Sequence, residues 1–200
     1  QPGQRHHDDG PFQVFLAAGA ASYLGIDGSH NMACAARERL AGTIGRVVQS
    51  TIESMTLSAE LFDRVCSRLA FHYIEDLTPT FSMVRQSLRA NGLFVFSVEH
   101  PVITSSDAAA TESGLRGRWI VDDYFTTGRR TTNWMGGDVV KYHRTVSDYF
   151  AAVQAAGMQV VALRESNPDS AHFSDEALFR RRQRIPLFLF IAATPAVASR

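Results

Sequence analysis

The sequence has little that would tie it to an oxidising compartment, a membrane or a charged partner. Its 200 residues include only two cysteines, which indicate no disulfide framework. The 20 lysines and arginines are balanced by 20 aspartates and glutamates, so no global field attracts nucleic acid or an anionic membrane. No apolar run approaches the roughly 20 residues of a membrane span, and the first residues lack a signal-peptide pattern. We therefore expect a cytoplasmic protein that binds neither nucleic acid nor membranes.

What the sequence does contain is an alternation of strand and helix patterns. Apolar runs predict strands at 22–27, 46–52, 62–71, 93–98, 158–165 and 185–193. Apolar residues at helical spacing lie between these runs up to residue 165, which favours a mostly parallel sheet with helices on both faces. The polar stretch at 166–184 predicts no helix between the last two strands, so we expect the last strand to be antiparallel. The fold class is therefore α/β.

Residues 101–137 interrupt this alternation. The stretch is rich in glycine, serine, threonine, aspartate and arginine, and it holds both tryptophans of the chain. It is too long and too aromatic for a plain connection between a strand and a helix. We therefore predict a single domain over residues 1–200, with a cap inserted at about 101–137 that covers the substrate.

Four stretches of the chain, taken in order, carry a family likeness. They are LGIDGSHNMACAARERL, FDRVCSRLAFHYIEDL, VRQSLRANGLFVFSVEHP and RIPLFLFIAA. In this order they resemble the second strand and helix, the fourth strand, the fifth strand and the closing strand of class I S-adenosylmethionine-dependent methyltransferases of the small-molecule type. The resemblance covers most of residues 12–193. It implies a Rossmann-like sheet with an antiparallel last strand, S-adenosylmethionine as cofactor and S-adenosylhomocysteine as product.

The family's first motif, an acidic residue followed by alternating glycines, falls on the stretch QRHHDDG. Counting back along the chain, Gly10 takes the last glycine position, whereas His6 and Asp8 take the earlier ones and Gln4 takes the acidic one. The stretch also has no apolar run that could form a buried first strand. We therefore expect a sheet that is N-terminally incomplete.

This altered motif leaves three interpretations open. The chain is a truncated or misread methyltransferase, or it keeps the fold with a divergent terminus that binds the cofactor weakly or differently, or it has abandoned methyl transfer. Histidine and aspartate are also good metal ligands, but consecutive residues rarely converge on one ion. We therefore predict no metal site.

The resemblance implies that Asp27, at the tip of the second strand, accepts both ribose hydroxyls of the cofactor. The alternative is that Asp27 caps the following helix, although Ser29 is available for that role. The resemblance also implies an acidic residue near the adenine after the third strand, where Glu53 is the nearest carboxylate; the alternative for Glu53 is a solvated loop residue. The full set of predicted cofactor-binding residues is Gly10, Asp27, Gly28, Ser29, Met32, Glu53, Leu69 and Ala70.

Two histidines at the carboxyl ends of predicted strands, His72 and His100, are candidate catalytic bases. The unperturbed pKa of histidine lies near 6.5, which suits proton transfer at neutral pH. Glu99 could orient a neighbouring histidine. The alternative for His72 is a structural ring whose nitrogens are satisfied by the backbone.

Aromatic and cationic side chains of the cap suit a planar or carboxylated organic substrate. The alternative for the tryptophans is that they seal the insertion against the sheet. The predicted substrate-binding residues are Tyr73, Trp119, Tyr124, Arg130, Trp134 and His143.

The function predicted from these residues is S-adenosylmethionine-dependent methyl transfer to a small organic molecule by in-line displacement. The enzyme would act mostly by positioning the two reactants. The alternatives are a methyltransferase-like binding or regulatory module, and a non-methylating enzyme of secondary metabolism on the same fold.

Overall fold

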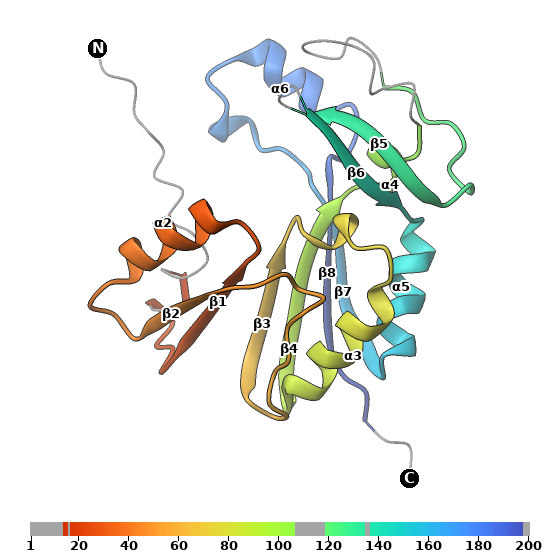
Figure 1. The fold of residues 1–200 in the computed structure, drawn as a ribbon. Coiled ribbons are helices and arrows are strands. Elements are labelled where there is room, and N and C mark those ends of the chain that lie inside the picture. Colours follow the sequence, from red (N-terminus) through yellow and green to blue (C-terminus); the bar gives the residue numbers. More distant parts are fainter. Residues whose placement is uncertain (1–13, 16, 107–118, 135–136, 198–200) are drawn as a thin grey trace, which may run out of the picture. The chain divides into compact units, whose positions relative to one another are not determined.

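The structure is a computed structural model that describes residues 14–15, 17–106, 119–134 and 137–197, without the side chains of 133 and 134. The chain divides into two compact units, Gln1–Thr56 and Leu57–Arg200, which we call the first and the second unit (Figure 1). No described helix has the length and the apolar character needed to cross a membrane.

The first unit contains two parallel strands joined by a helix. β1 (Tyr23–Asp27) pairs with β2 (Gly45–Gln49), and α2 (His30–Leu40) connects them. The predicted strand at 46–52 therefore ends at residue 49. Side-chain hydroxyls just beyond it, on Ser50 and Thr51, bond to Ser54 and form a turn instead of continuing the strand.

The second unit is built on a four-stranded sheet in the order β3-β4-β8-β7. β3 (Phe62–Arg68) and β4 (Leu88–Glu99) pair in parallel, whereas β8 (Phe188–Pro195) is antiparallel to both β4 and β7 (Met158–Glu165). The α/β class with a mostly parallel sheet and an antiparallel last strand is thus confirmed. Among the described residues, β1 and β3 each have one strand neighbour.

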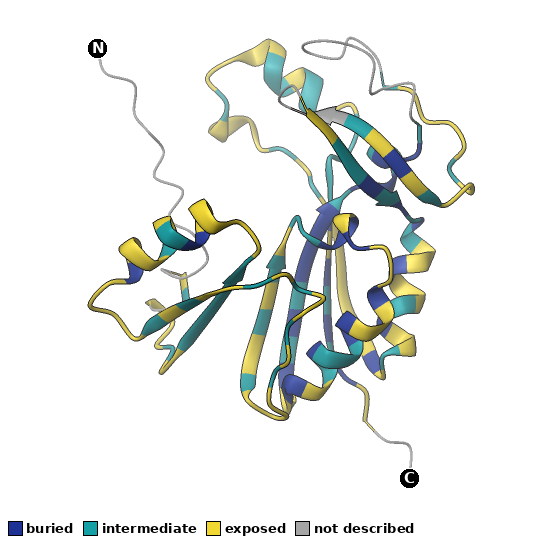
Figure 2. Ribbon diagram, in the orientation of Figure 1, coloured by how far each residue is buried: buried dark blue, intermediate teal, exposed yellow. Residues whose placement is uncertain are grey.

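The core of the second unit lies between this sheet and two helices, α3 (Leu77–Ser87) and α5 (Val146–Ala155), which contact each other on the same face (Figure 1). Alternate residues of β4 and β8 point into it, among them Phe94, Phe96 and Ile191. The rings of Phe71 and Phe81 meet edge to face beside them. Figure 2 shows this buried centre in dark blue.

Several boundaries differ from the sequence prediction. The predicted strand at 93–98 extends over Leu88–Glu99, directly after the helix α3, which begins at Leu77 and is capped by Asp76. The stretch at 166–184, predicted to lack a helix, contains η3 (Ser170–His172) and α6 (Glu176–Arg182). Short polar helices of this kind carry a weak periodic signal.

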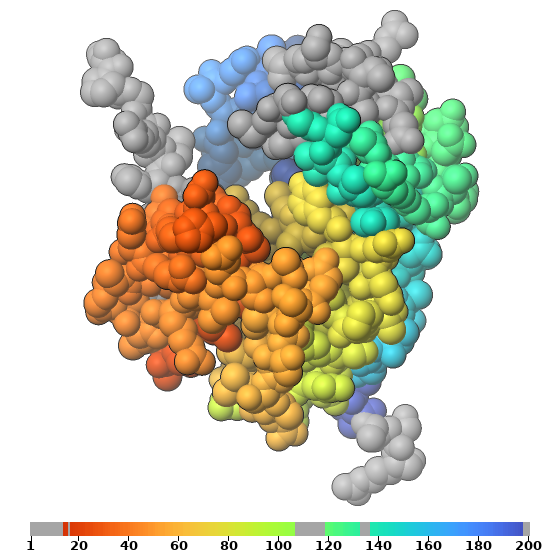
Figure 3. Space-filling view, in the orientation of Figure 1, coloured from red at the N-terminus to blue at the C-terminus, as the bar shows by residue number. Residues whose placement is uncertain are grey.

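The predicted cap contains regular structure at both ends. α4 (Pro101–Thr104) opens it, and a hairpin of β5 (Gly128–Trp134) and β6 (Gly137–His143) runs past residue 137. The 3-10 turn η1 (Phe71–Tyr73) follows β3 and contacts β6. In Figure 3 the yellow surface of the segment around η1 and α3 and the teal surface of the hairpin lie side by side.

Candidate functional site

The carboxyl end of β1 carries an acidic side chain that is not the helix cap. Ser29 caps α2, because its Oγ accepts the N–H of Met32 at 3.4 Å. Asp27 accepts the N–H of Ser29 at 2.8 Å through Oδ1, and its carboxylate makes no other hydrogen bond within the described part of the chain. A carboxylate held in this way at a strand end fits a pair of ribose hydroxyls.

The other predicted cofactor residues of the first unit lie near this strand end or in the loop after β2. Met32 lies on α2 and is 60% exposed. Gly28 follows Asp27, and a Cβ added there would reach only ordinary contact with Ser50 O at 3.9 Å. Glu53 is exposed in the turn after β2. Gly10 lies outside the described residues.

At the carboxyl end of β3 the backbone is strained. Leu69 has φ +53°, a left-handed conformation that leucine rarely adopts. Its N–H is held by the carbonyl of Ser97 at 2.9 Å and by the Ser97 hydroxyl at 3.3 Å. Strain that the surrounding structure enforces is concentrated at functional sites in proteins. The assignment of Leu69 and Ala70 to the cofactor site stays a prediction.

His72 is buried on η1, with 1% of its surface exposed. Its Nδ1 accepts the backbone N–H of Glu99 at 3.4 Å, so the proton of the neutral ring sits on Nε2. Burial lowers the pKa of His72 to about 4, further lowered by Lys141 and partly offset by Glu99. The ring is therefore neutral at pH 7. Its unprotonated nitrogen, Nδ1, which would have to accept the proton from a substrate, already accepts the Glu99 N–H. Its catalytic role stays a prediction.

His100 is engaged on both sides of its ring. Nδ1 accepts the N–H of Val102 at 3.2 Å and so caps α4, and Nε2 donates to Glu165 at 2.8 Å. Burial lowers the pKa of His100, although the Glu165 carboxylate opposes this. The carboxylate that orients His100 is therefore Glu165 at the end of β7, and His100 as a base also stays a prediction.

A buried ion pair lies beside His72 and was missed by sequence reasoning. Lys141 Nζ on β6 donates to Glu99 Oε1 at 2.6 Å, with both side chains largely removed from solvent. The Lys141 cation also lies 5.9 Å from the centre of the Tyr73 ring, which contacts the His72 ring in a tilted arrangement. The only sequence signal is that Glu99 ends an apolar strand; nothing local points to Lys141.

The structure brings two further predicted substrate residues, His143 and Tyr124, into contact. Buried His143 donates from Nε2 to the carbonyl of Tyr124 at 2.9 Å, and its Nδ1 accepts from Thr104 at 2.8 Å. The Tyr124 hydroxyl accepts the N–H of Val146 at 3.2 Å. These bonds tie the residues before the hairpin to α4 and α5.

The remaining predicted cap residues make contacts of other kinds. Arg130 is buried and donates to the backbone carbonyls of Ser105 and Thr126. The ring of Trp119 lies under the guanidinium of Arg181 at 5.1 Å. The side chain of Trp134 lies outside the described part of the structure. The substrate roles of these residues stay predictions.

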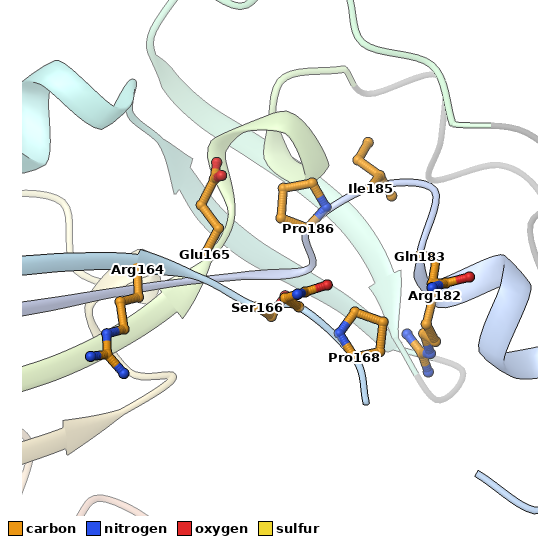
Figure 4. Close-up of a pocket in the computed structure, with 9 residues that line it drawn as sticks. Arg164, Glu165, Ser166, Pro168, Arg182, Gln183, Ile185 and Pro186 are labelled. Atoms are coloured by element: carbon orange, nitrogen blue, oxygen red, sulfur yellow. The ribbon is translucent and has the colours of Figure 1, made fainter. Parts of the chain in front are cut away.

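A cavity opens where β7 ends and β8 begins, and we call it the β7-end cavity (Figure 4). It has two adjoining lobes of about 430 and 460 Å³. Since β3, β4 and β7 run in one direction, this is the carboxyl edge of the sheet, where α/β proteins bind ligands. Its main lining residues are Arg164, Glu165, Asn167, Phe173, Arg182 and Phe190.

Comparisons with known proteins agree with this architecture. Residues 9–96 match the methyltransferase domain family. A presumed S-adenosylmethionine-dependent methyltransferase from Listeria monocytogenes is 33% identical, with a TM-score of 0.82 over 93% of this chain and 86% of that one. An S-adenosylmethionine-dependent methyltransferase from Mesorhizobium loti is 32% identical, with a TM-score of 0.81 over 92% and 86%. An uncharacterized protein from Haemophilus influenzae is 30% identical over 92% of this chain and 76% of its own length.

Proposed function

The chain belongs to the class I S-adenosylmethionine-dependent methyltransferases, and from this premise we propose that its methyl acceptor is a small organic molecule. The predicted family, enzymatic activity and cofactor are confirmed. The observation that supports a small acceptor is the β7-end cavity, because lobes of about 430 and 460 Å³ have the size of sites for small ligands. The balanced charge of the chain gives no field that would attract nucleic acid.

When bound, S-adenosylmethionine would supply a methyl group on a positively charged sulfur: a lone pair of the acceptor would bond to the methyl carbon in line as the carbon–sulfur bond breaks, leaving S-adenosylhomocysteine. We assign the ribose hydroxyls to Asp27, whose local turn is set by its bond to Ser29. Leu69 and Ala70 lay their backbone against the cofactor in this proposal. The remaining assigned contacts are Gly10, Gly28, Ser29, Met32 and Glu53.

A hydroxyl or carbon-acid acceptor must lose a proton as the new bond forms, whereas a neutral amine loses its proton after the bond has formed. The proposed bases are His72 and His100. Each would first release the backbone N–H that its unprotonated nitrogen accepts, from Glu99 and Val102 respectively. The protein contributes mainly by positioning the two reactants, which converts a bimolecular step into an intramolecular one.

Calorimetric titration with S-adenosylmethionine and S-adenosylhomocysteine tests the cofactor assignment. We expect micromolar binding to the wild-type chain and at least tenfold weaker binding to Asp27→Ala. Asp27→Asn should fall between them, because its amide oxygen can still accept the Ser29 N–H while the charge is lost. Asp138→Ala, which removes an exposed carboxylate of β6, is the matched control. Unchanged binding by Asp27→Ala would refute the ribose role.

The class of acceptor is tested with methyl-labelled S-adenosylmethionine. The enzyme is incubated with a cell extract that has been separated into small molecules, proteins and nucleic acids. We expect the label in the small-molecule fraction, and only when active enzyme is present. Label transferred solely to protein or nucleic acid would contradict a small acceptor.

A further inference from the structure

The β7-end cavity combines an apolar surface with two arginines. Arg164 lies opposite Phe190 in the antiparallel register of β7 and β8, so both side chains stand on one face of the sheet. Phe188, two residues before Phe190, shares that face. The loop after β7 and the end of α6 complete the lining with Asn167 and Arg182.

Within the described part of the chain, both arginines lack the partners that such side chains usually find. Neither Arg164 nor Arg182 forms a hydrogen bond or an ion pair with another residue in the described ranges. The other arginines of α6 are engaged: Arg180 pairs with Glu176 at 2.8 Å, and Arg181 lies over Trp119. Arg164 is exposed on β7, whereas Arg182 is half-buried, so Arg182 is the cation that gains most from an anionic ligand.

The electrostatics at Arg182 favour an anion of single charge. Burial and the neighbouring Arg181 both lower the pKa of Arg182, which means that its charge is poorly compensated in the free protein. Glu165 also lines the cavity, but its carboxylate is bonded to His100 and points away from Arg182 (Figure 4). Because Glu165 adds a negative charge to the rim, a doubly charged phosphate is disfavoured relative to a carboxylate.

We propose that the β7-end cavity recognises the methyl acceptor as an amphipathic carboxylate. The carboxylate binds the planar guanidinium of Arg182, with the amide of Asn167 as a neighbouring donor. The apolar body of the acceptor lies on Phe173, Phe188 and Phe190. This inference rests on the proposed function, since it names the substrate class of the same enzyme.

Paired aryl probes test the inference by NMR titration of the full chain. The probes are 3-phenylpropionate and its neutral amide, which have the same apolar body. We expect the wild-type chain to bind the carboxylate at least tenfold more tightly than the amide. Arg182→Gln should bring the two affinities to within about twofold, and Arg182→Lys should keep part of the preference because it retains the charge without the planar fork.

Arg180→Gln is the matched control, because it removes an exposed arginine of the same helix whose surface ion pair contributes little to stability. It should leave the preference unchanged. Equal affinities in the wild type, no binding of the carboxylate, or an unchanged preference in Arg182→Gln would each overturn the inference. Titration of every variant with S-adenosylhomocysteine separates this result from a failure of the methyltransferase function, since we expect the Arg182 variants to bind it as the wild type does.

Discussion

Among single residues, His72 makes the clearest link between burial and pH. Its pKa falls from 6.5 in the unfolded chain to about 4 in the folded protein, chiefly because the ring is buried. Between these values the unfolded chain binds a proton that the folded protein does not. The contribution of the neutral His72 ring to the free energy of unfolding is therefore complete above pH 6.5 and is lost as the pH falls towards 4. The free energy of unfolding decreases by about 3 kcal/mol at most through this loss.

Urea unfolding at pH 7 and pH 4.5 checks this expectation. The wild type should lose more of its free energy of unfolding over this interval than His72→Asn, whose amide oxygen can take over the Glu99 N–H. The variant keeps some pH dependence, because burial also lowers the pKa of His100 and His143. Equal losses in the two proteins would show that His72 does not titrate as described.

Leu69 gives a second prediction at this scale. Alanine is normally more stable than glycine in regular structure, but at φ +53° the order should reverse. We expect Leu69→Gly to exceed Leu69→Ala in free energy of unfolding by about 1 kcal/mol. The glycine and alanine substitutions of Val65, which lies within β3, are the control. There the alanine variant should have the higher free energy of unfolding. Glycine less stable than alanine at both positions would disprove the strain.

How far single residues can be predicted from sequence depends on the reach of their contacts. Asp27 and Ser29 act on neighbours two or three residues away, so their pattern was visible in the sequence. Glu99 and Lys141 are 42 residues apart, and His100 and Glu165 are 65 apart. Pairs of this kind form only when the sheet and the hairpin are folded, so no local sequence pattern predicts them.

At the scale of elements, α5 begins with a capping box formed by Thr145 and Asp148. The Thr145 hydroxyl accepts the N–H of Asp148 at 3.1 Å, and the Asp148 carboxylate accepts the N–H of Thr145 at 2.8 Å. Thr145→Ala should therefore lower the free energy of unfolding by about 1–2 kcal/mol. Thr145→Ser, which keeps the hydroxyl, and Ser147→Ala, on an exposed position, should each cost far less. Thermal or urea unfolding measures the differences.

Elements that the sequence did not predict have little apolar signal of their own. The helix α6 has no buried residue and depends on Asp175, which accepts the N–H groups of Ala177 and Leu178. The strand β5 reads GRRTTNW and is defined by its pairing with β6. The strands β4 and β8, in contrast, were visible because alternate residues of both point into the core.

At the scale of the whole molecule, the two units differ in how much they bury. In the first unit the described residues that are buried are Ala33 and Leu40, both on α2, and β1 is only half-buried throughout (Figure 2). The second unit holds the aromatic core around Phe94 and Phe96. Since buried apolar area is the main source of stability, the first unit should open more readily than the second.

Amide hydrogen exchange tests this difference and the cofactor assignment together. In the free protein, amides of β1 and β2 should exchange at least tenfold faster than those of β4 and β8, because local opening needs less free energy where little apolar surface is buried. Saturating S-adenosylhomocysteine should slow exchange at residues 27–30 and at 69–71, and Asp27→Ala should abolish the slowing at 27–30. Asp138→Ala, which changes an exposed carboxylate elsewhere, should leave it intact. Equal exchange rates in the two units would contradict the burial argument. Protection at residues 27–30 that survives Asp27→Ala would contradict only the ribose role of Asp27, because the protection given by a ligand depends on its contacts in the bound state.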